Sequence, residues 1–283
     1  MRYNGLPQPW SRAVLRSLLL ISALFVVDED VDAQQLSRWP DQQEAGPYLI
    51  HADFKIARIP GLVDELVKLE RDISQVLKIG APRERVYLFL FQNKSSYQKY
   101  VSRYFPEIPG RQALYIKKRG PGMVFAYLSD DFLIDLRHET THALLHANLA
   151  MVPLWLDEGL AEYFEVIPQN RVHSHRHLRA VKWKNRLGRL REMEKLEGIS
   201  DICKMRKAEY EEAWSWVHFM LHGDAFALKE LQSYLADIKS MNPPGQLSRR
   251  LRTRVANLDD NYRSHVHSWP SRPAVAEVQR SRF

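Results

Sequence analysis

Three side chains in the middle of the sequence have the types and the spacing of a metal site. His138, Glu139 and His142 stand in the order His-Glu-x-x-His. Residues that are four apart lie on the same side of a helix, so both imidazoles can reach one cation. Glu139 lies about 100° round the helix axis, beside that cation, where its carboxylate can hold a water molecule instead of binding the ion. The motif therefore predicts a zinc ion that activates water for hydrolysis.

The third ligand of such an ion is not expected from the same helix. A catalytic zinc ion usually takes three protein ligands and keeps a fourth position for water. A third histidine six residues after His142 is excluded, because that position is Asn148. His146 lies one turn beyond His142, but three ligands on one face of a straight helix cannot surround an ion tetrahedrally. Another element must therefore complete the site.

A second helix is predicted directly after Pro153, which ends the first one. Residues 156–164 place apolar side chains on one side of this helix and two carboxylates, Glu158 and Glu162, on another. Packed against the zinc helix, this segment can present Glu158 as the third ligand. Glu162, one turn further on, and Asp157 can then accept the outer N–H groups of the ligand histidines.

The two segments together resemble a known group of enzymes. His-Glu-Thr-Thr-His at 138–142, followed by Trp-Leu-Asp-Glu-Gly-Leu-Ala-Glu-Tyr at 155–163, is similar to the gluzincin branch of the zinc peptidases, in particular the M1-type aminopeptidases and the bacterial peptidase MA-like families. It also resembles an uncharacterised bacterial family of secreted proteins that carry the same pair of helices. The resemblance implies one zinc ion per chain on His138, His142 and Glu158. The chain between the two segments is shorter than in the aminopeptidases, so the loop between the helices must be tighter.

The resemblance also implies the fold and two further parts of the site. The expected fold is zincin-like α+β, with a small mixed β-sheet followed by the active-site helix and a mostly helical C-terminal part. In the related enzymes an edge strand of the sheet pairs with the extended substrate. The candidate edge strand here consists of Met123, Val124, Phe125 and Ala126. A helix of the aminopeptidases supplies a tyrosine hydroxyl to the oxyanion, and the matching residue is Tyr210. The implied reaction is hydrolysis of peptide bonds, with Glu139 as the general base.

Two other functions are compatible with the same residues. A peptidase-like scaffold could hold zinc and bind a protein at the cell envelope without cutting it. Alternatively, the zinc could be structural, in an envelope protein whose basic surface binds an anionic polymer. A structural zinc ion is usually enclosed by four protein ligands, so a fourth side chain on the ion would favour this last function.

The rest of the chain is expected to form the sheet and the helices around this site. Apolar alternation and helical spacing predict the order β-α-β-α-β-β before a zinc helix at 131–150. The predicted elements are strands at 48–54, 85–92, 113–116 and 123–128, and helices at 61–79, 95–104, 207–221, 225–236 and 247–258. The basic stretch 171–191, with His173, His175 and His177 at alternate positions, is interpreted as a solvated face.

The ends of the chain differ in composition from this central part. Residues 1–33 contain arginines before a short apolar run, which is the pattern of a secretory signal peptide. Export is therefore expected, with an uncleaved membrane anchor as the alternative. Residues 34–46 are interpreted as a linker, 47–260 as the peptidase domain with a helical subdomain from 166 onward, and 261–283 as a flexible tail.

The overall charge bears on partners rather than on the fold. The chain of 283 residues has a net charge of +7 and a pI near 9.4, which favours anionic partners such as an envelope component. The predicted partner of the site itself is a peptide or protein substrate, and no nucleic acid is expected. Cys203 is the only cysteine, which excludes an internal disulfide.

Overall fold

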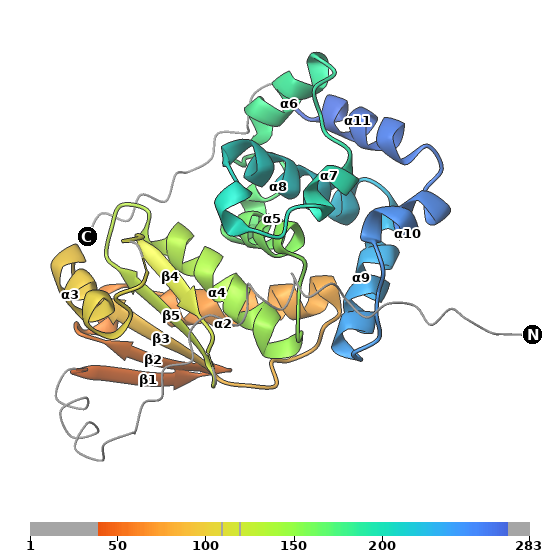
Figure 1. Cartoon of the computed structure of the whole chain (residues 1–283). Helices are drawn as coiled ribbons and strands as arrows, with labels where there is room; N and C mark the ends of the chain where they lie inside the picture. The colour runs from red at the N-terminus through yellow and green to blue at the C-terminus, as the bar shows by residue number, and fades with distance from the viewer. Residues whose placement is uncertain (1–38, 109, 119, 271–283) are drawn as a thin grey trace, which may run out of the picture.

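The protein is a mixed α+β structure in which a sheet comes first and helices follow (Figure 1). The computed structural model describes residues 39–270 except 109 and 119, so the predicted signal peptide lies outside the described residues. A five-stranded mixed sheet near the N-terminus precedes a mostly helical C-terminal part, which confirms the predicted fold class. None of the helices in the described part of the chain combines the length and the apolar character needed to cross a membrane.

The sheet has the strand order β1-β2-β3-β5-β4. Its strands are β1 (Asp41–Ala45), β2 (Tyr48–Ala52), β3 (Val86–Phe91), β4 (Ala113–Ile116) and β5 (Gly122–Tyr127). The three central strands β2, β3 and β5 run parallel, and the outer strands β1 and β4 are antiparallel to their neighbours. Parallel neighbours need a crossover connection. Helices α2 (Leu62–Leu77) and α3 (Lys94–Tyr104) provide these connections.

The prediction that Met123–Ala126 form the edge strand is wrong. These residues belong to β5, which pairs with β3 on one side and with β4 on the other. Both sets of backbone hydrogen-bonding groups of β5 are therefore used within the sheet, and no substrate strand can be added there. The edge on this side is β4, which pairs with β5 from Ala113↔Ala126 to Ile116↔Met123.

The predicted linker at 34–46 is also wrong where it overlaps β1. Asp41–Ala45 form a strand whose side chains are alternately half-buried and exposed. An outer strand with one solvated face can be built from polar residues, so composition alone did not reveal it. Gly46 has a φ of 55° in the tight connection to β2, a conformation that glycine adopts without steric cost.

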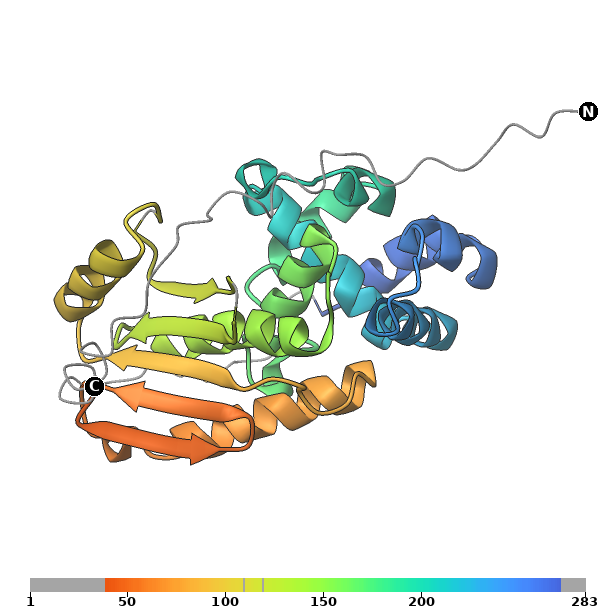
Figure 2. The same ribbon diagram turned by 60° about the horizontal axis from the view of Figure 1, so that its bottom comes forward.

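Each face of the sheet has its own apolar core. Alternate residues of the central strands, such as Ile50, Leu88 and Val124, point to the face covered by α2 and by α4 (Phe132–Asn148). The intervening residues, such as Phe91 and Phe125, pack on the other face against α3 and Trp39. Figure 2 shows α2 and α4 lying along one side of the strands. Because alternate residues of each strand point to this face, the face is apolar, and α4 packs on it beside β4 and β5.

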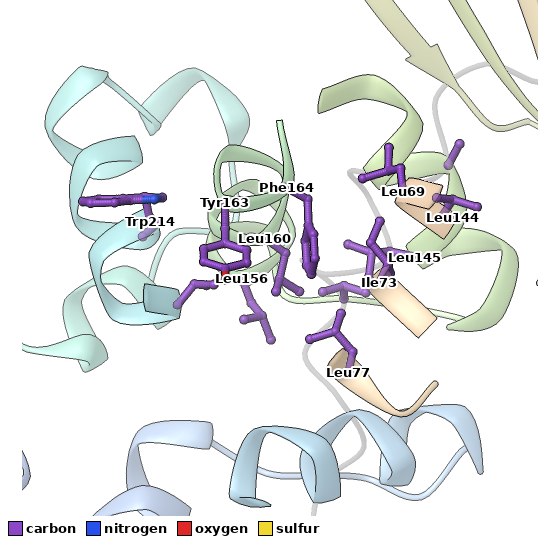
Figure 3. Close-up of a cluster of buried hydrophobic side chains, with 14 of the residues drawn as sticks. Leu69, Ile73, Leu77, Leu144, Leu145, Leu156, Leu160, Tyr163, Phe164 and Trp214 are labelled. Atoms are coloured by element: carbon purple, nitrogen blue, oxygen red, sulfur yellow. The ribbon is translucent and has the colours of Figure 1, made fainter. Parts of the chain in front are cut away.

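The helical part packs on the sheet part through α5. Its helices are α5 (Leu154–Phe164), α6 (Leu178–Arg186), α7 (Met193–Glu197), α8 (Lys207–His222), α9 (Ala225–Lys239), α10 (Leu247–Arg254) and α11 (Leu258–Ser268), with two short 3-10 turns, η2 (Pro168–Asn170) and η3 (Ile202–Lys204). A further 3-10 turn, η1 (Ile56–Arg58), lies between β2 and α2. In Figure 3, apolar side chains of α5 lie between those of α2 and α4 on one side and Trp214 of α8 on the other. Residues 153–164 are thus held from both sides, which fixes the rotation of α5 about its axis.

The predicted flexible tail at 261–283 is wrong over its first part. Residues 258–268 form α11, in which Tyr262 and Val266 are buried. Asn185 of α6 donates a hydrogen bond of 2.8 Å to the carbonyl of Arg263, and Trp269 is buried after the helix ends. The buried residues recur at helical spacing, but the segment as a whole is polar. Its composition alone therefore did not predict a packed helix. Residues 271–283 lie outside the described part of the chain.

Candidate metal centre

The structure brings three predicted ligand atoms together between α4 and α5. His138 and His142 lie one turn apart on α4, and their Nε2 atoms are 3.3 Å apart. Glu158 comes from the start of α5, and its Oε2 lies 3.6 Å from His138 Nε2 and 3.7 Å from His142 Nε2. The exposed fractions of the three side chains are 17%, 8% and 10% in the same order. They form a triangle that could hold a metal ion.

The size of this triangle fits a small tetrahedral cation. Zinc–nitrogen and zinc–oxygen bonds of about 2.0–2.2 Å at tetrahedral angles place two ligand atoms about 3.3–3.6 Å apart. The distances among the three atoms lie at this separation or slightly beyond it. Two imidazole nitrogens with a carboxylate oxygen are also a donor set that zinc prefers. By size and by chemistry, His138, His142 and Glu158 fit the ion that the sequence predicts.

Asp157 of α5 and Glu165, the residue that follows this helix, contact the outer nitrogens of the histidines. Nδ1 of His138 donates to Oε2 of Glu165 at 3.0 Å. Nδ1 of His142 lies 3.0 Å from Oδ2 of Asp157, which is also 3.0 Å from Nε2 of His146. An imidazole that carries its proton on Nδ1 presents the lone pair of Nε2. The two carboxylates therefore orient both rings with their free nitrogens facing Glu158.

Charge in this pocket favours a cation at its centre. Burial disfavours the charged imidazole of His142, but Asp157 and Glu158 raise its pKa to about 9. Burial also opposes ionisation of Asp157 and Glu165, yet the neighbouring histidines hold the pKa of both carboxyls below its ordinary value. Negative charge on α5 is therefore maintained around the two rings. Without a metal ion, a proton on His142 compensates part of this charge, and a bound dication would displace that proton and compensate the charge in its place.

Glu139 follows the ligand His138 on α4, and Tyr210 lies on α8, which packs against α5. Glu139 is half-buried on α4, and no partner for its carboxylate is found among the described residues. Burial raises the pKa of Tyr210, and the charges of Glu158 and Glu139 act in the same direction. The raised pKa means that the hydroxyl of Tyr210, on α8, keeps its proton. It can act as a hydrogen-bond donor.

Glu162 lies close to His138 but does not accept its outer N–H: one carboxylate oxygen of Glu162, one of Glu165 and a ring nitrogen of His138 lie within 4.8 Å of one another, as a second group that could hold a metal ion. The place beside His138 belongs to Glu165, and Glu162 instead accepts hydrogen bonds of 2.9 Å from Arg176 and from His177 Nε2. Arg176 also pairs with Glu165 at 3.2 Å. Glu162 and Glu165 thus share one guanidinium, which stabilises the charge on both.

The solvated face predicted for 171–191 is wrong for two of its histidines. His175 and His177 are buried, and only His173 of the three is exposed. His175 stacks on Trp214 with ring centroids 4.4 Å apart and contacts the carbonyl of Glu162 at 2.9 Å. The buried acidic groups at the end of α5 need donors, and these histidines provide them. Neither belongs to the described groups that could hold a metal ion.

Glu165 and Arg176 are the residues of the site that the sequence analysis missed. A signal for Glu165 does exist, because Glu158, Glu162 and Glu165 have the spacing i, i+4, i+7 of one helix stripe. Extending the carboxylate stripe of α5 by one further turn would have found it. Arg176 comes from an irregular segment between η2 and α6, so no periodicity points to it.

Replacing Glu165 by Gln should weaken metal binding without unfolding the protein. The amide keeps the size of the side chain but loses the charge that orients His138 and raises its basicity, an effect of about 10–100-fold in metal affinity. Metal affinity is measured by competition with a chromogenic chelator. Glu65→Gln is the matched control, since Glu65 pairs with Arg137, the neighbour of His138, and not with a ligand. Equal affinities in the wild type and Glu165→Gln would show that Glu165 does not support the ligand.

Comparison with protein families gives a match that covers the candidate metal centre. A family model described as "Protein of unknown function (DUF1570)" matches residues 134–244. The matched segment runs from α4 into the chain after α9 and includes all the site residues described above. Comparison with curated proteins gives no match.

Proposed function

We propose that the protein is a zinc-dependent peptidase of the gluzincin type. The observation that carries the proposal is the triangle of His138 Nε2, His142 Nε2 and Glu158 Oε2, with sides of 3.3–3.7 Å. Glu139 follows the first ligand on α4, and its carboxylate has no partner among the described residues. Three protein ligands leave a coordination position for water, which distinguishes a catalytic from a structural zinc ion. The resemblance of 138–142 and 155–163 to the gluzincins supports the same assignment.

Each residue of the site has a chemical role in this proposal. When bound, zinc supplies the acidity that makes a water molecule nucleophilic near neutral pH and polarises the scissile carbonyl. Glu139 accepts the proton of the attacking water and delivers it to the leaving amine. Tyr210 donates a hydrogen bond to the oxygen on which negative charge develops. Glu165 and Asp157 keep the two imidazoles in position.

The free edge of β4 is the surface on which an extended substrate can be aligned. β4 pairs only with β5 among the described residues, so its other edge has backbone donors and acceptors available. Tyr115 of β4 stacks on the rings of His142 and His146, with interplanar angles of 17° and 13°. The edge of β4 therefore lies beside the ligands. A peptide added to it as a further strand would pass the site.

Metal analysis and a peptide-library digest together test the proposal. We expect the purified protein to contain about one equivalent of zinc, as one three-ligand site predicts. We also expect it to cleave peptides from the library, and a variant with Glu158→Ala to lose both properties. Zinc without any cleavage would instead favour a binding module that keeps the ligands. A purified protein with no measurable affinity for zinc would contradict the proposal.

Removing the metal should stop cleavage and lower thermal stability together. A ligand that binds only the folded state stabilises it by about 2.7 kcal/mol when present at a hundred times its dissociation constant. Treatment with 1,10-phenanthroline should therefore abolish turnover and reduce the melting temperature, and added zinc should restore both. The non-chelating 1,7-phenanthroline is the control. Full activity after complete metal removal would contradict the proposal.

A further inference from the structure

A cavity beside the metal centre is lined by both acidic and basic side chains. Its volume is about 480 Å³, and it lies between the end of α5, the start of α6 and the start of α8. Glu162 is among its lining residues, and a carboxylate oxygen of Glu162 lies within 4.8 Å of a ring nitrogen of the ligand His138, so the cavity lies beside the metal centre. A substrate held at the metal centre can extend a side chain or a chain end into this space.

The carboxylates that line the cavity are already paired. Glu162 is buried and bound by Arg176 and His177 at 2.9 Å. Glu211 is buried as well, and it pairs with Lys184 at 2.9 Å. Because these acidic groups face protein cations, they offer little negative charge to a ligand.

Two cations of the same cavity are free to face a ligand. Arg179 on α6 and Lys207 at the first position of α8 both line the cavity, and both side chains are exposed. Neither has a carboxylate within ion-pair distance in the part of the chain that the structure describes. The lining charges that have no ion-pair partner among the described residues are thus the positive charges of Arg179 and Lys207.

We propose that this cavity is a subsite for a carboxylate group of the substrate, held by Arg179 and Lys207. The occupant is the side chain of Asp or Glu, or the C-terminal carboxylate of a peptide, next to the bond that is cut. The inference rests on the proposed peptidase function of the neighbouring metal centre. It adds a substrate class: acidic peptides rather than neutral or basic ones. A cationic subsite would also reject basic side chains by like-charge repulsion.

Binding to a variant that does not turn over separates this inference from catalysis. The probes are fluorescein-labelled alanine-based peptides with C-terminal amides, each with a single Glu scanned along the chain, and their partners with Gln at the same position. A peptide with a free C-terminal carboxylate and no Glu tests the other source of the carboxylate. Affinities are measured by fluorescence anisotropy with zinc-loaded Glu139→Gln protein, at low and at high salt.

The expected result is a preference of about 10-fold for one Glu position, or for the free C-terminus, over the neutral peptide, the effect of two partly exposed ion pairs. This preference should shrink at high salt. The double change Arg179→Gln and Lys207→Gln should remove it and leave the affinity of the neutral peptide unchanged. The matched control is Lys99→Gln with Arg249→Gln, two exposed cations on α3 and α10 that also lower the net charge by two.

The outcomes distinguish this inference from the proposed function. Equal binding of acidic and neutral peptides would overturn the subsite, even if the wild type cleaves peptides. Equal loss of both affinities in the double variant would overturn it too, because the change would then act on the fold. A retained acidic preference in Glu139→Gln protein, together with no cleavage by the wild type, would support the subsite and reject the peptidase.

Discussion

Replacing Glu139 by Gln should abolish peptide hydrolysis and leave the metal in place. The amide has the same size as the carboxylate but cannot accept the proton of the attacking water. Loss of a general base costs about 10²–10⁴-fold in rate. Metal binding should be unchanged, because Glu139 is not one of the three side chains of the ligand triangle. Turnover of a cleaved library peptide and the zinc content of the purified variant are the two measurements.

The same experiment needs a control for the loss of a carboxylate in general. Glu192→Gln removes an exposed acidic group just before α7 and should retain wild-type activity. A fully active Glu139→Gln would reject the proposed mechanism. Loss of zinc from Glu139→Gln would instead assign this residue to the metal, and a different group would have to act as the base.

The convergence of His138 and His142 could be predicted because it is a local property. The spacing i, i+4 places two side chains on one helix face whatever the rest of the protein does. The contribution of Glu158 from α5 was also predictable, because the apolar side of 156–164 determines which side of that helix packs inward. Such predictions need only the helical period and a turn at Pro153.

Strand order and the burial of polar residues depend on contacts distant in sequence. The hairpin of β4 and β5 was predicted correctly, but nothing local decides which of the two strands pairs with β3. The edge strand was therefore assigned to the wrong member of the pair. Likewise, the basic sequence around His175 and His177 predicts exposed side chains. In the structure both are buried, and Nε2 of His177 forms a hydrogen bond with the buried carboxylate of Glu162. Buried acidic groups on a neighbouring helix reverse what composition suggests.

Changing Gly159 to Ala should destabilise the fold and disturb the metal centre together. Gly159 follows the ligand Glu158 and lies where α5 crosses α8. A Cβ atom there would stand 2.7 Å from the carbonyl oxygen of Ala213, 2.8 Å from its carbonyl carbon and 2.9 Å from Cγ2 of Val217. The first two atoms are backbone of α8, so the helices must separate. The expected loss is about 1–3 kcal/mol in the free energy of unfolding, which outweighs the roughly 1 kcal/mol by which Ala favours a helix over Gly.

Chemical denaturation and chelator competition measure these two effects on the same variant. Gly198→Ala is the matched control, because its Cβ would meet nothing closer than 3.6 Å and its φ is −73°. A shift of α5 away from α8 moves Glu158 relative to α4, so metal affinity should fall with stability. Wild-type stability of Gly159→Ala would contradict the close approach of the two helices. Lower stability with unchanged metal affinity would mean that α5 remains fixed to α4, and that α8 alone gives way to the added methyl group.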